Sequence, residues 1–265
     1  MERQPLLTLL SDFGARDVYV GIMKGVIAQI NPKLVMVDLT HEIPPQDIAA
    51  ARFCLMDAYA YFPVGTVHLA VVDPGVGGKR RAIAIEFDNG FLVGPDNGIF
   101  SGVLSQTPAI TAVELTNRQY WRTPQPSSTF HGRDIFAPVA AHIASGVPLQ
   151  QLGQEIDPKT LIELEIGKIS FQSNSITGSI QYIDRFGNLV TNIPGSYVQN
   201  KSWNVRIGEQ IINGRNTYGD VATKQAIALV GSHGWVEIAI NSGNAQAQLQ
   251  VNLGDTVQVC YTDVS

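Results

Sequence analysis

The sequence lacks the residues that build disulfide frameworks and metal clusters. Only two of its 265 residues are cysteines, Cys54 and Cys260, and two are too few for either kind of site. Four of the five histidines have no mutual spacing typical of zinc ligands: His41, His68, His142 and His233. We therefore expect neither structural disulfides nor a metal site.

Long hydrophobic runs are also missing. No apolar stretch approaches the roughly 20 residues that a membrane-spanning helix needs. The chain passes from Met1 through Arg3 almost directly into a strand pattern, without the architecture of a signal peptide. These features predict a soluble, cytoplasmic protein that does not associate with membranes.

Charge is scarce, and no long basic block is present. Charged residues make up 15% of the chain, the net charge is -5 and the pI is about 5.5. This pattern argues against a nucleic-acid partner and favours a small or cationic ligand. Typical chains carry about 25% charged residues, so the low fraction indicates surface that is buried between subunits. The 45% of hydrophobic residues suffices for a substantial core.

Three well-known ligand and catalytic motifs are absent as well. No G-x-G-x-x-G follows the first strand pattern, which disfavours a dinucleotide site. No G-x-x-x-x-G-K-[ST] phosphate loop is present. Without a G-x-S-x-G elbow, and with no cysteine near a histidine motif, covalent acyl chemistry is unsupported.

The first 165 residues alternate between strand and helix patterns. Buried-strand patterns lie at 6–10, 35–39 and 67–72, helical patterns at 19–30, 47–61 and 134–144, and a hairpin around Asn89-Gly90 at 82–93. Asp47 and Asp134 stand where helix N-caps are expected. This alternation predicts an α/β fold class, with a Rossmann-like domain over 1–165 whose largely parallel sheet is covered by helices.

Helical periodicity ends near Asp157-Pro158, and short strands follow. Strand patterns separated by Gly, Asn and Ser lie at 178–183, 189–193, 203–207, 226–230, 236–240 and 256–261. This spacing is typical of a small antiparallel barrel or sandwich. We expect a smaller C-terminal β-barrel domain over 172–265, with the boundary between 165 and 172.

A carboxylate and a guanidinium flank a glycine-rich turn where the third strand pattern ends. Asp73 follows the strand, residues 75–78 read Gly-Val-Gly-Gly, and Arg80 comes next. Ligand sites in α/β sheets gather beyond the carboxyl ends of strands, so the pair is a candidate site. A structural salt bridge across a tight turn explains the same residues.

Asp12 and His131 are further candidates in this half of the chain. Asp12 ends the first strand pattern, where a carboxylate accepts hydrogen bonds from ribose hydroxyls in many nucleotide sites. His131 lies in the loop before a helix and can titrate near neutral pH. The alternatives are a turn acid at Asp12 and an exposed loop histidine at His131.

Polar turns connect the short strands of the second half. Asp184 and Asn188 share one turn, and Ser232 and His233 share another. An Asn amide suits an adenine edge and an Asp carboxylate suits an ammonium group. Ordinary hairpin turns use the same residues.

Taken together, these segments resemble the S-adenosylmethionine hydroxide adenosyltransferase family, also called S-adenosylmethionine hydrolases, whose relatives include fluorinases and chlorinases. The resemblance covers nearly the whole chain. The matching stretches are 11–24, 72–81, 94–98, 130–134, 184–192 and 232–245.

The resemblance implies a role for each candidate. Asp73, Arg80 and His131 would form a water-handling triad; halogenating relatives replace the acid and the imidazole and carry a small hydroxyl residue where this chain has Gly132. The substrate-binding residues would be Asp12 for the ribose, Asp184 for the methionine ammonium, Asn188 for the adenine and Ser232 for the methionine carboxylate. His233 departs from the short residue or arginine expected there. A homotrimer with sites at subunit interfaces is also implied.

The expected reaction is hydrolysis of S-adenosyl-L-methionine to adenosine and L-methionine, by displacement at the ribose C5′. S-adenosylmethionine is then the small-molecule substrate, and no cofactor is expected. The alternatives are a nucleoside-binding or sensing protein with negligible turnover, and an adenosyl halogenase. A general nucleoside hydrolase is disfavoured because the aspartate-rich calcium motif is absent. The roles of Lys79 and Arg81 stay open.

Overall fold

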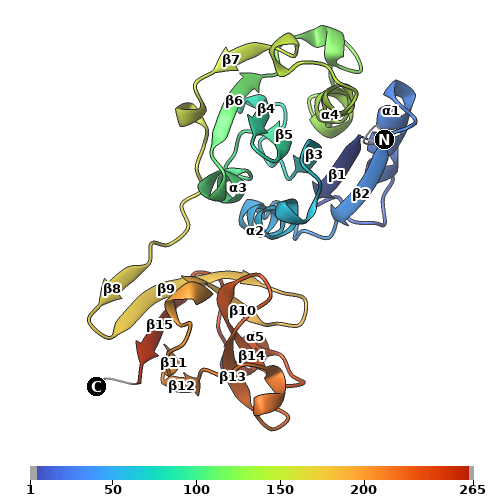
Figure 1. Cartoon of the computed structure of the whole chain (residues 1–265). Coiled ribbons are helices and arrows are strands. Elements are labelled where there is room, and N and C mark those ends of the chain that lie inside the picture. The colour runs from blue at the N-terminus through green and yellow to red at the C-terminus, as the bar shows by residue number, and fades with distance from the viewer. Residues whose placement is uncertain (1–4, 263–265) are drawn as a thin grey trace. The chain divides into compact units, whose positions relative to one another are not determined.

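The computed structural model describes residues 5–262, and the chain divides into two compact units (Figure 1). The first unit spans Met1–Leu164 and the second Glu165–Ser265. Each unit has its own hydrophobic core. No helix among the described residues is long and apolar enough to cross a membrane.

The first unit is built on one seven-stranded sheet with the order β2-β1-β3-β5-β4-β6-β7. Its strands are β1 Leu6–Ser11, β2 Val35–Thr40, β3 Thr66–Val71, β4 Ala82–Phe87, β5 Gly90–Pro95, β6 Ala109–Glu114 and β7 Gln154–Ile156. Four neighbouring strands, β2, β1, β3 and β5, are parallel, and the hairpin partner β4 starts an antiparallel edge. The largely parallel sheet and the hairpin are therefore confirmed.

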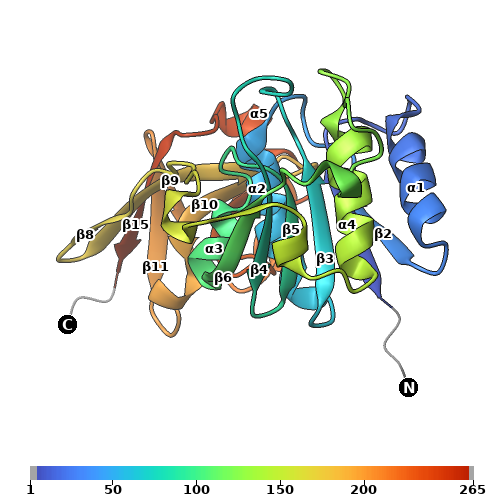
Figure 2. The same ribbon diagram turned by 90° about the horizontal axis from the view of Figure 1, so that it is seen from above.

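Helices cover both faces of this sheet (Figures 1 and 2). Helices α1 Tyr19–Ile30 and α4 Ala137–Ala144 lie side by side on one face, while α2 Ile48–Ala58 and α3 Ser101–Gln106 lie on the other. Asp47 caps α2 as expected, since its carboxylate accepts the N–H of Ala50 at 2.9 Å. Short 3-10 turns occur at Tyr59–Tyr61, Arg118–Tyr120, Leu149–Gln151 and Pro158–Thr160.

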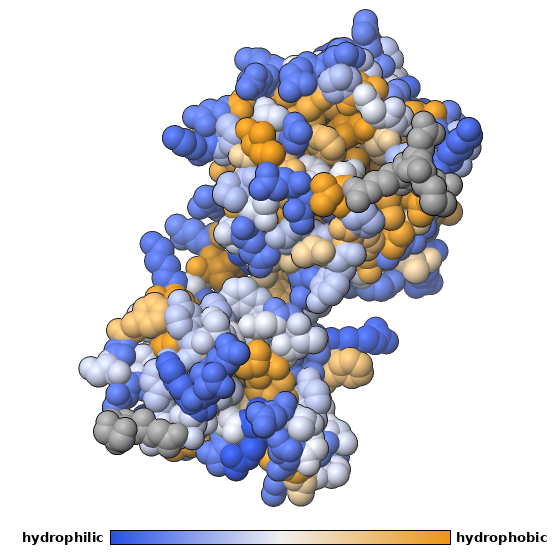
Figure 3. All heavy atoms as spheres, viewed as in Figure 1, coloured by the Kyte–Doolittle hydropathy of each residue, from blue (hydrophilic) through white to orange (hydrophobic). Residues whose placement is uncertain are grey.

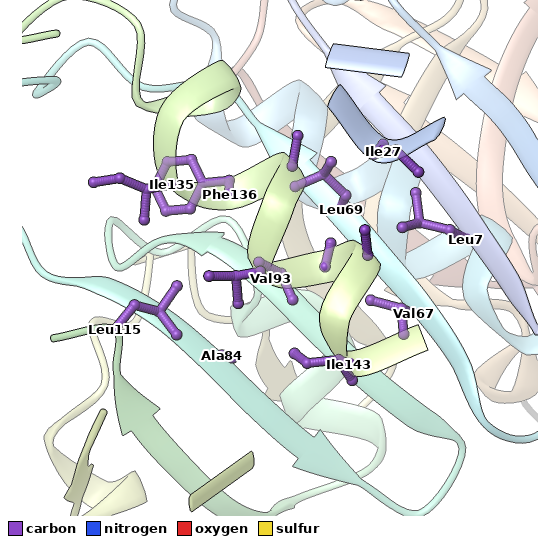
Figure 4. Close-up of a cluster of buried hydrophobic side chains, with 14 of the residues drawn as sticks. Leu7, Ile27, Val67, Leu69, Ala84, Val93, Leu115, Ile135, Phe136 and Ile143 are labelled. Atoms are coloured by element: carbon purple, nitrogen blue, oxygen red, sulfur yellow. The ribbon is translucent and has the colours of Figure 1, made fainter. Parts of the chain in front are cut away.

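A large core cluster of the first unit lies between the sheet and helices α1 and α4, and α2 contributes further buried residues such as Phe53 and Leu55. Every residue of β3 is buried, the polar Thr66 and His68 included, as expected of a parallel strand covered on both faces. Figure 4 shows Ile135, Phe136 and Ile143 from one helical segment packed near Val67, Leu69 and Val93 of the sheet. The segment that carries Ile135 and Phe136 is thus anchored firmly beside the ends of β3 and β5.

The second unit is an antiparallel sheet that almost closes into a barrel. Its strand order is β12-β11-β15-β9-β10-β14-β13, with β8 paired to β9, and a bridge between Gly214 and Ala228 links the two ends of this order. The bounds are β8 Ser170–Gln172, β9 Ser175–Ile183, β10 Leu189–Pro194, β11 Trp203–Ile207, β12 Gln210–Asn213, β13 Ala226–Val230, β14 Trp235–Ile240 and β15 Thr256–Tyr261, with one short helix, α5 Ala245–Leu249. The barrel-like fold of this half is confirmed.

Apolar side chains also reach the surface. On the face shown in Figure 3, hydrophilic side chains are interspersed with patches of apolar ones. The most exposed large apolar residues include Val18, Tyr61, Val64, Ile110, Phe171 and Phe186. A low charged fraction is therefore accompanied by exposed apolar surface.

Candidate active site

Asp73 and Arg80 form a buried ion pair where β3 ends. Asp73 lies two residues beyond the strand, and Arg80 lies two residues before β4. The Arg80 Nε donates to both carboxylate oxygens, at 3.0 and 3.1 Å, and Nη2 donates to Oδ2. Only 6% of the Asp73 side chain and 11% of the Arg80 side chain are exposed. Such a bidentate grip fixes the plane of the guanidinium.

His131 joins this pair through the same guanidinium. The Arg80 Nη2 lies 2.7 Å from the His131 Nδ1. An arginine can only donate, so Nδ1 must accept, and the neutral ring carries its hydrogen on Nε2. Burial lowers the pKa of His131 most, and the charge of Arg80 lowers it further, against the opposing effect of Asp73 and Asp134. The structure therefore brings the three expected triad residues into one hydrogen-bonded group.

A π-helical segment, Gly132–Phe136, places His131 and corrects one expectation. Asp134 is not the N-cap of the helix, because the helical turn begins earlier, with His131 at the N-cap position. The Asp134 side chain is 1% exposed and accepts hydrogen bonds from Arg122, Arg133 and the Ser127 N–H. It is therefore a buried anchor for the His131 segment. Single π turns are frequent at functional sites.

Close packing of two loops keeps the triad together. Gly77 has a φ of +74°, and a Cβ at this position would collide with the carbonyl oxygen of Ser128. The glycine-rich turn after Asp73 thus rests directly on the loop that leads to His131. The Arg80 guanidinium also lies over the Phe136 ring, 5.1 Å from its centroid.

Asp12 leaves the sheet beside Asp73. Ser11 pairs with Val71 on the neighbouring parallel strand, so both acids follow the same edge of the sheet. The Asp12 Oδ2 accepts the Gln46 N–H at 2.8 Å. The hydroxyl of the preceding residue, Ser11, lies 2.7 Å from the His41 Nδ1. Asp12 therefore does act as a loop anchor, on the edge where a ribose contact is expected.

Arg81 and Lys79, whose roles the sequence left open, both lie near the turn that carries Arg80. Arg81 donates to Asp96 at 2.8 Å and to the Thr160 hydroxyl at 3.0 Å, so it holds the end of the β4–β5 hairpin. Its guanidinium is thus engaged away from Asp73. Lys79 is exposed in the turn.

In the second unit, Asp184 and Asn188 form one polar turn between β9 and β10. The Asp184 carboxylate accepts the N–H groups of Phe186 and Asn188 at 2.8 Å and the Asn188 side-chain amide at 3.0 Å. Gly187 packs so tightly on the Asn244 side chain that a Cβ would collide with it. The segment is therefore a hydrogen-bonded turn, as the sequence allowed, and it brings a carboxylate and an amide together.

Ser232 does not join that turn. It is exposed in the turn between β13 and β14, and the pairing of Pro194 with Trp235 places this turn at the opposite end of β10 from Asp184. The neighbouring His233 packs against β14, with Nδ1 accepting the Trp235 N–H at 3.1 Å and Nε2 lying 3.1 Å from the buried Glu237.

Sequence reasoning missed the polar cluster around Glu237. Tyr218 donates to the other Glu237 oxygen at 2.7 Å, and burial together with this carboxylate raises the pKa of Tyr218. Glu237 is the one acid in an otherwise apolar strand, and this could have indicated a buried polar cluster from the sequence. Among residues 5–262, no three His, Cys, Asp or Glu side chains are grouped to hold a metal ion.

Proteins similar to this chain over nearly its full length are known. The curated "(R)-S-adenosyl-L-methionine hydrolase" of Salinispora tropica is 39% identical over 98% of this chain and 99% of its own. A crystal structure titled "uncharacterized conserved protein from Thermotoga maritima" has a TM-score of 0.90 and 36% identity, covering 96% of this chain and 99% of that one. A fluorinase of Nocardia brasiliensis is more distant, at 24% identity over 97% of both chains.

Family models match both units. Residues 7–153 match the SAM hydroxide adenosyltransferase N-terminal domain, and residues 178–258 match the C-terminal domain of the same family. Together the two matches cover most of the chain, including the segments that carry Asp73, His131 and Asp184. The chain belongs to the SAM hydroxide adenosyltransferase family.

Proposed function

We propose that this protein is an enzyme that hydrolyses S-adenosyl-L-methionine to adenosine and L-methionine. The observation that carries the proposal is the Asp73–Arg80–His131 group, assembled at the sheet edge that also holds Asp12. Full-length relatives named S-adenosylmethionine hydrolases support the same reaction. S-adenosylmethionine is the substrate, and the proposal includes no cofactor.

The reaction is displacement at the ribose C5′ by water or hydroxide. The sulfonium leaves as a neutral thioether, so the leaving group needs no proton. The attacking water keeps one hydrogen as the new 5′-hydroxyl and releases the other as a proton to solvent. The difficulty therefore lies with the nucleophile, because bulk water has a pKa of about 15.7.

Each triad residue has a task in that step. The His131 Nε2–H donates a hydrogen bond to the water and fixes its position, and the Arg80 guanidinium stabilises its hydroxide character. Asp73 holds the guanidinium in place. It also accepts a hydrogen bond from the water O–H that later releases its proton to solvent. Holding water and C5′ at attack distance contributes up to roughly 7–11 kcal/mol to the lowering of the barrier.

Substrate binding uses the other candidates. Asp12 accepts hydrogen bonds from the ribose hydroxyls, Asp184 binds the methionine ammonium and Asn188 binds the adenine edge. Ser232 is not included in this set, because it lies at the opposite end of β10 from Asp184. Charge complementarity supports the pairing of Asp184 with an ammonium group. The protein acts as a homotrimer with each site at a subunit interface, which is consistent with the low charged fraction and the exposed apolar residues.

Turnover in ¹⁸O-labelled water tests the reaction. The purified protein is incubated with S-adenosylmethionine in halide-free buffer made with the labelled water. The products are then separated by chromatography, and their masses are measured by mass spectrometry. Adenosine that carries one ¹⁸O at the 5′ position is the expected product. Binding without product would indicate a sensing protein, and 5′-halogenated adenosine formed only with added halide would indicate a halogenase.

A further inference from the structure

Two hydroxyl–imidazole pairs lie along strand β1. In the middle of the strand, the Thr8 Oγ1 lies 2.8 Å from the His68 Nδ1, and both side chains are buried. At its end, the Ser11 Oγ lies 2.7 Å from the His41 Nδ1. The two contacts are nearly the same, but only the second lies next to Asp12, the acid proposed for the ribose. The pairs can therefore be compared by matched substitutions.

A carboxylate holds the imidazole of His41 from its other side. The His41 Nε2 lies 3.1 Å from the Asp38 Oδ1, and the Lys24 Nζ donates to the Asp38 Oδ2 at 2.5 Å. The register of β1 and β2 shifts after Asp38, and this bulge brings Asp38 and His41, three positions apart, to the same side. Burial opposes the charge of Asp38, but Lys24 and His41 lower the pKa of its carboxyl, so the group stays ionised. The ring is thus held between a hydroxyl and a carboxylate.

Ser11, His41 and Asp38 have the composition of a nucleophilic triad, yet the position of the serine argues against that chemistry. Ser11 is 0% exposed, and only 9% of the His41 side chain is exposed. An activated serine has to reach its substrate. The Ser11 Oγ instead accepts the Phe13 N–H at 3.3 Å, across the residue that carries the proposed ribose acid. The group is therefore suited to holding a loop.

The loop that His41 holds is the one that carries Asp12. The His41 carbonyl oxygen accepts the Gly14 N–H at 2.7 Å, so the ring and the backbone of one residue contact both ends of segment 11–14. The Asp12 Oδ2 accepts the Gln46 N–H at 2.8 Å. Within residues 5–262 this is the one hydrogen bond that the Asp12 carboxylate accepts, so Oδ1 stays available as an acceptor. A fixed segment 11–14 fixes the direction of that oxygen.

We propose that His41 is a positioning residue for the ribose: its contacts to segment 11–14 hold the Asp12 carboxylate in the direction that the two ribose hydroxyls require. This inference rests on the proposed function, in which Asp12 binds the ribose of S-adenosylmethionine. A carboxylate that accepts from two neighbouring hydroxyls needs a defined orientation, because hydrogen bonds weaken steeply as their angles bend. His41 therefore contributes to the preference for a ribose over a 2′-deoxyribose.

Adenosine and 2′-deoxyadenosine, which differ by one hydroxyl, are the probes, and their Kd values are measured by calorimetry. The wild type should bind adenosine roughly 10- to 100-fold more tightly, the range for one hydrogen bond to a charged group. In His41→Ala this ratio should fall roughly 3- to 10-fold, and His41→Asn should restore part of it, because an amide can again contact the Ser11 hydroxyl. KM for S-adenosylmethionine should rise in His41→Ala with a smaller change in kcat.

His68→Ala is the matched control. It removes the same ring from the same kind of pair on β1, away from Asp12, so the ratio of the two Kd values should stay within about twofold of the wild type. A double-variant cycle with Asp12→Asn is the second test. His41→Ala should change the ratio little once the Asp12 carboxylate is gone, because both residues act on one contact. If melting curves show that His41→Ala fails to fold, Ser11→Ala takes its place and should lower the ratio in the same way.

The outcomes bear on different claims. An unchanged ratio in His41→Ala, an equal fall in His68→Ala, or a fall that persists in the Asp12→Asn background would overturn the role of His41. A wild type that prefers adenosine but releases none from S-adenosylmethionine would overturn the proposed hydrolysis and leave the role of His41 standing. A wild type that binds both nucleosides equally would overturn the ribose contact of Asp12, and the role of His41 with it.

Discussion

Replacing Asp73 by Asn tests the triad most directly. The substitution keeps the shape of the side chain but removes the charge that grips Arg80 through three hydrogen bonds. With 11% of its side chain exposed, Arg80 is left as a buried cation without a counter-charge. Freed from its bidentate hold, the guanidinium can also leave the His131 ring.

Two magnitudes follow from this geometry. Removing one partner of a buried ion pair costs about 3–5 kcal/mol of folding stability. For a chain of this length, that corresponds to a fall in Tm of roughly 5–15 °C. Loss of a positioned donor for the developing charge lowers kcat by about 100- to 1000-fold. Substrate affinity should change by less than about threefold, because Asp73 acts after binding.

Single-turnover kinetics, separate binding measurements and thermal unfolding distinguish these effects. Asp96→Asn is the matched control, since Asp96 is 3% exposed, pairs with Arg81 and accepts the Ile162 N–H. It should lose comparable stability while keeping its kcat. Assays are run well below the lower Tm, so that both variants are folded.

A double variant completes the test. Asp73→Asn combined with Arg80→Met removes the unpaired cation and places an apolar chain against Phe136, so much of the lost Tm should return. Activity should stay low, because the water has lost its ligands. If kcat of Asp73→Asn fell less than about fivefold, or returned together with Tm in the double variant, the pair would be structural and the triad mechanism wrong.

Three further outcomes are expected. Burial lowers the pKa of His68 to about 4, whereas the unfolded ring titrates near 6.5, so the unfolded state alone takes up protons between these values. The free energy of unfolding should therefore keep its whole value above pH 6.5 and fall by about 3 kcal/mol between pH 6.5 and pH 4. In His68→Gln, urea unfolding should not show this decrease. Because the pKa of His131 is lowered from 6.5, kcat should hold as pH falls through 6.5 and drop only below it; a pH–rate profile checks this. Gly77→Ala should lower kcat and Tm through its collision with Ser128, whereas Gly65→Ala, at φ +90° in open space, should lower the free energy of unfolding by only about 1 kcal/mol through backbone strain.

The sequence predicted those elements whose cause is local. The buried strand at β3, the Asn-Gly hairpin and the Asp47 cap depend on residues within a few positions of each other, and all three are confirmed. Helix α3 and strand β6 were missed, because Ser101–Gln106 is too short for a clear helical period and Ala109–Glu114 follows almost directly.

Asp134 shows why the rest could not be predicted. A polar residue just before an apolar helix is the standard sign of an N-cap, and the local pattern gave no reason to expect anything else. Its actual role depends on Arg122, 12 positions earlier, which tertiary folding brings to the same carboxylate. The contact of His233 with Glu237 is a similar case, because the register of β13 and β14 decides which face of the hairpin carries the acid.

The charge balance of the triad bears on which nucleophile it can hold. An isolated guanidinium in a buried pocket would attract a halide ion, but Asp73 neutralises Arg80 and the His131 ring is neutral. The group therefore offers polar hydrogen-bonding atoms without a net positive charge. A halide would have to lose its hydration shell beside a carboxylate, which is unfavourable, whereas a neutral water molecule both donates to the acid and accepts from the imidazole. In the proposed mechanism, Asp73 therefore favours water over halide through electrostatics, in addition to holding Arg80 in place.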